Sequence, residues 1–369
     1  MPDAKPLTKV EVERFMSIRE TTIDLGAINV LIGANGTGKS NFLSLFDMVG
    51  SLRDQRLSLW AAQRGGADRV MFNGTKQSPT MRLRLEFTES QGYEAELAAA
   101  TDGSLYFERE FVWGTGIGYE QPFNVLMQPG GTESKLPQEV AGHLGGVAAW
   151  TMACLSGWRR YHFHDTSSGA GVKHPQPIAD NRELNRDGSN LAPFLHALRQ
   201  NDLVRYERIR DTIRTVTPFF DDFVLEAEAL NRSTIRLGWR HTDSEMFADA
   251  TMLSDGTLRF MCLATVLLQP NPPKVVLIDE PELGLHPYAI HQLAELFHAA
   301  STRSQLVVAT QSVTLLDQVR LDDVIVAERS GGASVLRRVD PKGLQHWLDD
   351  YSLGELWTKN LIGARPRHA

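Results

Sequence analysis

A glycine-rich segment at residues 33–40, GANGTGKS, contains the residues with the clearest chemical role. It has the spacing G-x-x-x-x-G-K-[ST], the Walker A pattern, in which backbone N–H groups turn inward around phosphate oxygens. The lysine of such a loop neutralises the β- and γ-phosphates, and the final hydroxyl binds Mg²⁺. The segment therefore predicts a site for ATP and Mg²⁺. The expected nucleotide-binding residues are Gly33, Asn35, Gly36, Thr37, Gly38, Lys39, Ser40 and Asn41, with Ser40 also a metal ligand.

Two adjacent carboxylates follow an apolar run later in the chain. Residues 275–278, VVLI, lead directly into Asp279 and Glu280. A buried parallel strand that ends in acids is where α/β sheets bind ligands. We expect Asp279 to hold Mg²⁺, directly or through water, and Glu280 to act as the general base on the attacking water. The alternative is a surface turn with two acids, and the upstream phosphate loop argues against it.

The residues around these motifs predict an α/β protein. Residues 27–32 form an apolar run typical of a buried strand, and residues 41–52 have helical apolar spacing. Residues 275–278, 305–309 and 323–328 predict strands separated by helices, as in a parallel sheet. Further strands are expected at residues 9–15, 21–25, 81–87, 105–113, 123–127 and 159–163, of which the third to fifth suggest an antiparallel sheet, with a hairpin at 223–229 and 234–239.

The remaining segments predict helices and loops. Residues 190–216 and 258–268 have helical patterns, and residues 341–361 are expected to be helical. Residues 114–146, rich in Gly, Pro and polar types, predict a mobile loop, and residues 167–180 predict an exposed loop.

A third short motif, LSDGT at residues 253–257, precedes the helical pattern. Alone it predicts only a helix start with Ser or Asp as the N-cap. In the order phosphate loop, LSDGT, IDEPELGLHP, the chain resembles the ABC-type ATPase superfamily, where LSDGT stands for the LSGGQ-like signature and IDEPELGLHP for Walker B and the D-loop. The likeness is closest to SMC-like and RecF-like ATPases and to the head of OLD nucleases. It covers nearly the whole chain, and the segment YHFHDTS…DNRELNRDGSNLAPFL is similar to stand-alone bacterial AAA-type members.

This resemblance implies a single ABC-type head over residues 1–369, with a mixed parallel sheet, an antiparallel β subdomain and an embedded mainly helical lobe. The implied nucleotide-binding lobe comprises residues 1–149 and 258–340. The implied signature lobe is 150–257, and a helical tail follows at 341–369. No sustained heptad pattern predicts a long coiled coil.

The resemblance also implies a homodimer in which two heads sandwich two ATP molecules. Ser254, Asp255 and Gly256 would then contact the nucleotide of the partner subunit. Gln311 stands where many relatives have a catalytic switch histidine. Glutamine can hydrogen-bond a γ-phosphate but cannot gain a proton near neutral pH, so slow hydrolysis is expected.

Three further features depart from the family pattern or leave it open. His286 stands where the D-loop often has Asp. The glutamine of the Q-loop has two candidates, Gln121 and Gln128. A metal site is conceivable at His162 and His164 beside Asp165, but no third ligand stands at a diagnostic spacing, which favours structural histidines.

Composition limits the partners. The formal net charge is −7, so any contact with DNA needs a local basic patch. The arginines of residues 205–214 are interpreted as a solvated helix face, with a DNA track as the alternative. Cys154 and Cys262 are expected to be buried and reduced, which fits a cytoplasmic protein. No signal peptide or membrane span is predicted, so no membrane partner is expected.

These patterns lead to one main functional hypothesis and two alternatives. The main hypothesis is ATP-dependent dimerisation that regulates a DNA-related or anti-phage defence activity, with a separately encoded nuclease or toxin-like effector. Because the sequence ends soon after its last predicted strand, the Toprim domain of OLD nucleases is not expected. One alternative is a RecF-like repair ATPase that binds DNA directly. The other is the ATPase subunit of a transporter, against which the LSDGT string and Gln311 both argue.

Overall fold

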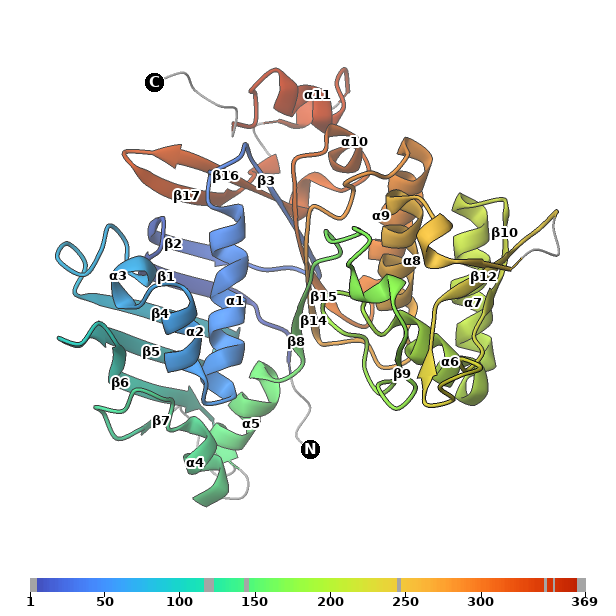
Figure 1. Ribbon diagram of the computed structural model, residues 1–369. Helices are drawn as coiled ribbons and strands as arrows, with labels where there is room; N and C mark the ends of the chain where they lie inside the picture. Colours follow the sequence, from blue (N-terminus) through green and yellow to red (C-terminus); the bar gives the residue numbers. More distant parts are fainter. Residues whose placement is uncertain are drawn as a thin grey trace. The chain divides into compact units, whose positions relative to one another are not determined.

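The computed structural model describes residues 5–115, 123–142, 146–243, 247–341, 344–347 and 349–363. The chain forms two compact units, one of Met1–Trp158 with Arg320–Ala369 and the other of Arg159–Val319. Each unit is described by itself (Figure 1). The predicted lobes at residues 1–149, 150–257 and 258–340 stay predictions.

Unit 1 is built on a mixed sheet with the strand order β7-β6-β5-β4-β1-β2-β17-β16-β3. The pairs from β7 to β2 are antiparallel, which confirms the predicted antiparallel region. The pair of β16 with β3 is parallel. Its strands are β1 (Lys9–Phe15), β2 (Ile18–Asp24), β3 (Ile28–Ile32), β4 (Thr80–Thr88), β5 (Gln91–Ala99), β6 (Leu105–Gly114), β7 (Phe123–Leu126), β16 (Val324–Ser330) and β17 (Ala333–Arg338).

Helix α1 (Lys39–Arg53) of unit 1 is the helix predicted after the phosphate loop. It lies with α2 (Leu57–Gln63) on one face of the sheet (Figure 1). Its apolar side chains at positions 42, 45, 46 and 49 are all buried, as its spacing predicts. The other helices are α3 (Ala67–Val70), α4 (Leu136–Gly142), α5 (Gly146–Leu155), η3 (Leu321–Asp323), η5 (Gln345–Trp347) and α11 (Leu353–Thr358).

Unit 2 contains the parallel pair β14 (Val275–Asp279) and β15 (Gln305–Thr310), as predicted. Both strands are buried almost throughout, and α9 packs against β15. Unit 2 also contains a small sheet of strand order β10-β12-β13 and the two-stranded pair β11-β9. The other strands are β8 (Trp158–Tyr161), β9 (Gln176–Pro177), β10 (Phe220–Val224), β11 (Thr234–Ile235), β12 (Gly238–His241) and β13 (Phe247–Asp249). The helices are η1 (Gly171–Lys173), α6 (Leu191–Asn201), α7 (Leu203–Val216), η2 (Ala250–Met252), α8 (Asp255–Leu268), α9 (Pro287–Ser301) and α10 (Val313–Leu316).

The expectation of a loop through residues 114–146 was wrong, because α4 starts at Leu136, which is buried. The cause is Glu110, a buried carboxylate on β6. Its Oε1 accepts a hydrogen bond from Ser134 Oγ at 2.5 Å, and its Oε2 accepts one from the Lys135 N–H at 2.8 Å. These contacts with a distant strand hold the segment, and composition alone does not reveal them.

Three other expectations need correction. The single helix predicted at 190–216 is two helices, because Asp202 interrupts it and caps α7 by accepting from the Arg205 N–H. Residues 167–180 are not wholly exposed, since Ala170 and Val172 are buried. The region 341–361 is not helical throughout: among its described residues, η5 and α11 are helical, and extended or turn residues lie between them. Strands β5, β9, β13 and β17 were not predicted.

Candidate functional site

The predicted phosphate loop lies in unit 1 between a buried strand and the start of a helix. All five residues of β3 are buried, and α1 begins at Lys39. Gly36 and Gly38 have φ angles of 77° and 102°, in the left-handed region that favours glycine. The backbone therefore makes the curl that the Walker A pattern predicts.

Two glycines of this loop are required by their neighbours. A Cβ at Gly33 would lie 2.2 Å from the carbonyl oxygen of Ala327 on β16. A Cβ at Gly38 would lie 2.2 Å from Ser334 Oγ on β17. Neither position can hold a larger side chain unless the sheet moves. Steric crowding by β16 and β17 therefore explains these glycines in addition to any contact with phosphate.

Lys39 is only 6% exposed, and its ammonium points back into the loop. Its Nζ donates to the carbonyl oxygens of Gly33 at 2.6 Å and Ala34 at 3.0 Å. Thr37 Oγ1 also donates to the Ala34 carbonyl, at 2.9 Å. The loop thus holds a positive charge at its centre, while Ser40 is exposed at the start of α1.

Ser17 joins the loop to the sheet, and sequence reasoning missed it. Asn41 Nδ2 donates to Ser17 Oγ at 2.6 Å, and Ser334 Oγ donates to the same oxygen at 2.7 Å. Ser17 lies in the turn between β1 and β2, and no motif marks it. The predicted nucleotide-binding role of Asn41 stays a prediction, and its amide has this partner within unit 1.

The predicted acidic pair lies in unit 2 where β14 ends. Asp279 is the last residue of the strand, and Glu280 has a φ of 45°, which is strained for a residue with a side chain. The Glu280 N–H donates to the Ala309 carbonyl at 2.8 Å, which anchors this turn to β15. The change in backbone direction gives the two neighbouring carboxylates different surroundings.

Asp279 forms an ion pair that the sequence does not reveal. Arg160 Nη2 on β8 donates to Asp279 Oδ2 at 2.8 Å, and the two side chains are 19% and 14% exposed. A charge-assisted hydrogen bond of this kind orients the carboxylate. Arg160 is 119 residues away along the chain, so no local pattern connects the two.

Glu280 and Gln311, predicted as base and γ-phosphate sensor, are brought together by the fold. Gln311 follows β15, and its Nε2 donates to Glu280 Oε1 at 2.5 Å. Because β14 and β15 are parallel neighbours, the residues after their C-terminal ends meet at one edge. This contact joins the two predicted catalytic residues.

The LSDGT segment forms a capped helix start, as predicted. Ser254 is the N-cap of α8, and its Oγ accepts from the Thr257 N–H at 3.1 Å. A Cβ at Gly256 would lie 2.2 Å from the Gly284 carbonyl oxygen, so Gly256 allows α8 to pack against the turn after β14. Asp255 has an exposed side chain, and Lys173 Nζ lies 3.7 Å from its Oδ1.

Arg259 is a buried arginine that sequence reasoning missed. Its Nε donates to the Phe163 carbonyl at 2.9 Å, and its Nη1 donates to the Leu283 carbonyl. Burial lowers the pKa of this guanidinium. A lone arginine inside the apolar run LRFMCLATVLL was the available signal, because buried charges need partners. Arg259 connects α8 to the turn that follows β14.

The remaining candidates are the histidine of the D-loop, the two histidines considered for a metal site and the two glutamines considered for the Q-loop. His286 is the N-cap of α9, where its Nδ1 accepts from the Tyr288 N–H at 3.2 Å, which explains a histidine in the D-loop. His162 and His164 are exposed, and the described ranges contain no group of three His, Cys, Asp or Glu side chains able to hold a metal ion. Gln121 lies outside the described residues. Gln128 is exposed, and its role in a Q-loop stays a prediction.

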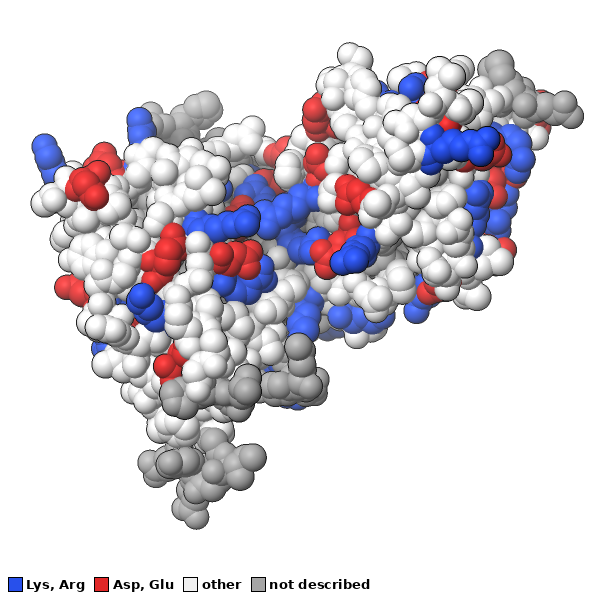
Figure 2. All heavy atoms as spheres, turned by 60° about the horizontal axis from the view of Figure 1, so that its bottom comes forward, with Lys and Arg blue, Asp and Glu red and all other residues white. Residues whose placement is uncertain are grey.

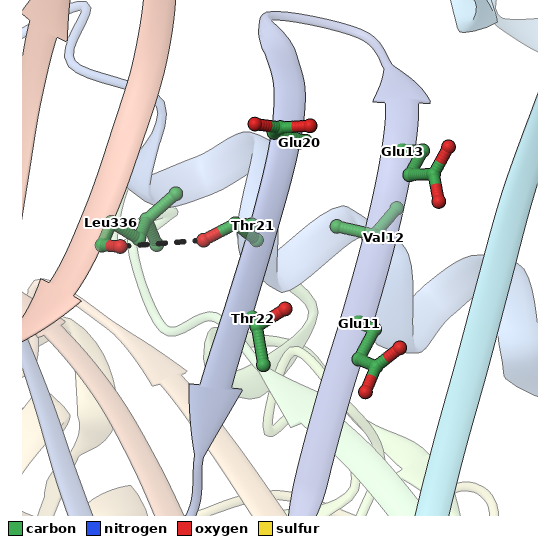
Figure 3. A pocket seen from close by; sticks show the side chains of 7 residues that line it. All are labelled: Glu11, Val12, Glu13, Glu20, Thr21, Thr22 and Leu336. Carbon is green, nitrogen blue, oxygen red and sulfur yellow. Dashed lines mark hydrogen bonds between the residues drawn. The ribbon is translucent and has the colours of Figure 1, made fainter.

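A cavity of about 290 Å³ lies on the sheet of unit 1 (Figure 3). Its lining includes the carboxylates of Glu11 and Glu13 on β1 and Glu20 on β2. Thr21 Oγ1 donates to the Leu336 carbonyl at 3.3 Å across one side. An acidic lining repels phosphate groups, so this cavity does not fit a nucleotide.

Two solved structures that are similar to the chain are heads of SMC proteins. One is the Smc head bound to the C-winged helix domain of ScpA, at 15% identity, covering 92% of this chain and 99% of that one, with a TM-score of 0.58. Another is the Smc head with an extended coiled coil, bound to the C-terminal domain of ScpA, from Pyrococcus furiosus. It has 14% identity, coverage of 94% and 99%, and a TM-score of 0.57. The fold is therefore that of an SMC-like, ABC-type ATPase head.

A protein family described as "AAA domain, putative AbiEii toxin, Type IV TA system" matches residues 28–126 and 158–317. The chain belongs to this family. Its matched residues include the phosphate loop, the acidic turn, the LSDGT segment and Gln311.

A curated relative, Nod factor export ATP-binding protein I of Rhizobium etli, is 26% identical over 178 residues. The match covers 48% of this chain and 51% of that protein, so the chain spans about half the length of this relative. Within the described ranges, none of the helices has the length and apolar character needed to cross a bilayer.

Proposed function

We propose that this chain is a cytoplasmic ATPase that binds ATP at residues 33–41 and hydrolyses it with Glu280 as general base. The hydrogen bond from Gln311 to Glu280 is the observation that carries the proposal. It holds a carboxylate at the end of a buried strand, in a strained turn typical of functional sites. Turnover is slow, because Gln311 cannot carry a proton as a histidine would.

The chain's own groups supply most of the chemistry. Lys39 exchanges its two loop carbonyls for the β- and γ-phosphates, because a phosphate attracts an ammonium more strongly than a neutral carbonyl does. Glu280 accepts a proton from the attacking water, and Gln311 keeps its carboxylate in place.

The residues proposed for Mg²⁺ have suitable chemistry. The Ser40 hydroxyl and the Asp279 carboxylate are hard oxygen donors, and Mg²⁺ in nucleotide sites commonly uses one or two carboxylates with phosphate oxygens and water. The ion would neutralise charge on the transferred phosphoryl group. The pair with Arg160 keeps Asp279 in one orientation.

We further propose that ATP joins two copies of the chain through Ser254, Asp255 and Gly256. The N-terminus of α8 is on the surface, where it can offer N–H groups to an anion brought by a second copy. Met252 beside it is 60% exposed, and Leu283 in the facing turn is 48% exposed. Apolar side chains exposed around this turn support a protein contact there.

The Glu280→Gln variant tests both proposals. It should still bind ATP, because Lys39, Ser40 and Asp279 are unchanged. Hydrolysis should fall roughly 10²- to 10⁴-fold, the usual contribution of a positioned base. ATP would then persist, and the dimer should accumulate by mass action. Light scattering with and without Mg-ATP measures this gain in mass.

Ser254→Arg, added to Glu280→Gln, should abolish the dimer, since a large cation would block the partner's phosphate. Ser233→Arg, which adds the same charge at another exposed serine of unit 2, is the matched control and should leave the dimer intact. A Glu280→Gln protein that binds ATP without gaining mass contradicts the sandwich. A dimer that forms equally without ATP means that another interface is used.

For the biological role we propose regulation of a separately encoded nuclease or toxin-like effector in anti-phage defence. The family description, which refers to a toxin of a type IV toxin–antitoxin system, supports this direction. The product of a neighbouring effector-like gene should associate with the ATP-bound Glu280→Gln protein and not with Lys39→Ala. Equal association with both variants would contradict control by ATP.

Direct binding of DNA is the second candidate, and three arginines of unit 2 favour it. Arg205 and Arg208 on α7 form no ion pair with a described residue. Burial lowers the pKa of the Arg303 guanidinium, and the charges of Arg205 and Arg208 lower it further. This agrees with the packing of α7 against α9, which ends two residues before Arg303. In contrast, Arg210 is paired with Asp211, as a solvated helix face predicts. Figure 2 shows that basic side chains gather in patches on the drawn face, despite the net charge of −7.

Salt-dependent DNA binding separates this candidate from the first. If these arginines contact phosphates, Arg205→Ala with Arg208→Ala should weaken binding and reduce the salt slope by about 2. Arg210→Ala is the matched control and should change binding little. The transporter alternative would be supported by co-purification of the chain with a membrane permease.

A further inference from the structure

Glu282, the third acid of the DEPE turn in unit 2, is directed at the end of β15. Its Oε1 accepts from Thr310 Oγ1 at 2.6 Å and from the Gln311 N–H at 3.3 Å. Its Oε2 is buried and has no hydrogen-bond partner among the described residues. In the same turn, Asp279 is proposed to hold Mg²⁺ and Glu280 to act as the general base. The two contacts of Glu282 indicate a role different from those of Asp279 and Glu280.

The contacts form a closed circuit between the two strand ends. Glu282 binds the backbone of Gln311, and the side chain of Gln311 binds Glu280, which lies two residues before Glu282. The Thr310 hydroxyl, held by Glu282, also accepts from the Ser312 N–H at 2.9 Å. Ser312 in turn caps α10 through the Leu315 N–H. The residues after β15 are therefore held by several hydrogen bonds, two of which end on Glu282.

We infer that Glu282 is a positioning residue that acts through Thr310 and Gln311 to keep Gln311 on the general base Glu280. This inference rests on the proposed ATPase function. In this role Glu282 needs no contact with the nucleotide or the reacting water. Its carboxyl group serves as a hydrogen-bond acceptor for one hydroxyl and one N–H, both of which a neutral group can satisfy.

The surroundings of Glu282 favour the neutral form. Burial raises the pKa of this carboxyl group, and the nearby charge of Glu280 raises it further. A buried carboxylate oxygen without a donor is costly, whereas a protonated carboxyl group carries no net charge. Asp279 and Glu280 differ, because a guanidinium and an amide donate to them.

Two substitutions separate this role from direct catalysis. Glu282→Gln keeps an amide oxygen for Thr310 and Gln311, so kcat should stay near that of the wild type. Glu282→Ala removes the acceptor, and kcat should fall about 10- to 150-fold with little change in KM, the loss expected when one hydrogen bond to a charged group is not held. Because both act on one contact, Glu282→Ala with Gln311→Ala should lose no more than either single variant. Inactivity of Glu282→Gln, or multiplicative losses in the double variant, would overturn the inference.

Two measurements without nucleotide keep this test independent of ATP hydrolysis. The backbone N–H of Gln311, which donates to Glu282, should exchange with deuterium faster in Glu282→Ala than in the wild type. In Glu282→Gln it should exchange at the wild-type rate. The infrared difference spectrum, wild type minus Glu282→Gln, should contain the band of one protonated carboxyl group. Unchanged exchange in Glu282→Ala would refute the positioning role. If the exchange and infrared results hold while the wild type fails to hydrolyse ATP, only the proposed ATPase function fails.

Discussion

Replacement of Gln311 by alanine tests the chemistry of the acidic turn most directly. In the structure, Gln311 Nε2 donates to Glu280 Oε1 at 2.5 Å, and the strained backbone of Glu280 gives the carboxylate a fixed starting direction. Without the amide, the carboxylate can leave the orientation needed to accept a proton from water. A general base must lie within hydrogen-bond reach of that proton, so loss of orientation lowers the rate.

The size of the effect follows from the type of hydrogen bond. A hydrogen bond to a charged group contributes about 1.5–3 kcal/mol, and each 1.36 kcal/mol corresponds to a tenfold change in rate, so Gln311→Ala should lower kcat about 10- to 150-fold. Gln311→His should keep or raise the rate, because the ring can donate a hydrogen bond and can also be protonated. Affinity for ATP should be unchanged in both variants, since the phosphate loop is intact.

The assay is steady-state hydrolysis, with ATP affinity measured separately by calorimetry. Gln318→Ala is a matched control, because Gln318 lies seven residues further on and bonds His291 at 2.6 Å instead of an acid of the turn. This control should hydrolyse ATP at the wild-type rate. If Gln311→Ala also turns over at the wild-type rate, Gln311 does not position the base, and the mechanism proposed for Glu280 loses its main support.

Three further outcomes are expected. Lys39→Ala should abolish ATP binding in calorimetry while the circular dichroism spectrum stays native, and unchanged affinity would contradict the phosphate-loop assignment. Arg160→Met should lower the local opening free energy of β14 by about 1–2 kcal/mol in hydrogen exchange, since a partly exposed charged hydrogen bond is lost. Arg159→Met is the control, because the ion pair of Arg159 with Glu183 is more exposed and stabilises the fold less. An equal effect of both variants would show that the Arg160–Asp279 pair stabilises β14 no more than an exposed ion pair does. Burial raises the pKa of the Cys262 thiol to about 12, so the thiolate is disfavoured at about pH 8.5. Iodoacetamide should therefore label Cys262 only after unfolding. Rapid labelling of Cys262 in the native protein would refute its burial.

The sequence alone was sufficient to predict a structural element where the pattern that indicates the element lies within the element itself. The phosphate loop, its buried strand and the amphipathic helix α1 are contiguous, so glycine spacing and apolar periodicity predict all three. The capped start of α8 at Ser254 was predicted for the same reason. The parallel pair β14 and β15 followed from apolar runs separated by a helical pattern.

Contacts between distant segments were decided only by the tertiary structure. The partner of Asp279 is Arg160, 119 residues away, and Ser17 is 24 residues from the Asn41 amide that it binds. No periodicity relates such residues, because their proximity depends on strand order and not on local spacing. The same holds for Glu282, because residue type alone does not determine whether its carboxyl group contacts a metal ion, water or a neighbouring strand. Hydrogen bonds and burial, which exist only after the strands have paired, turn three similar acids into an arginine-bound carboxylate, a base held by an amide, and a buried acceptor.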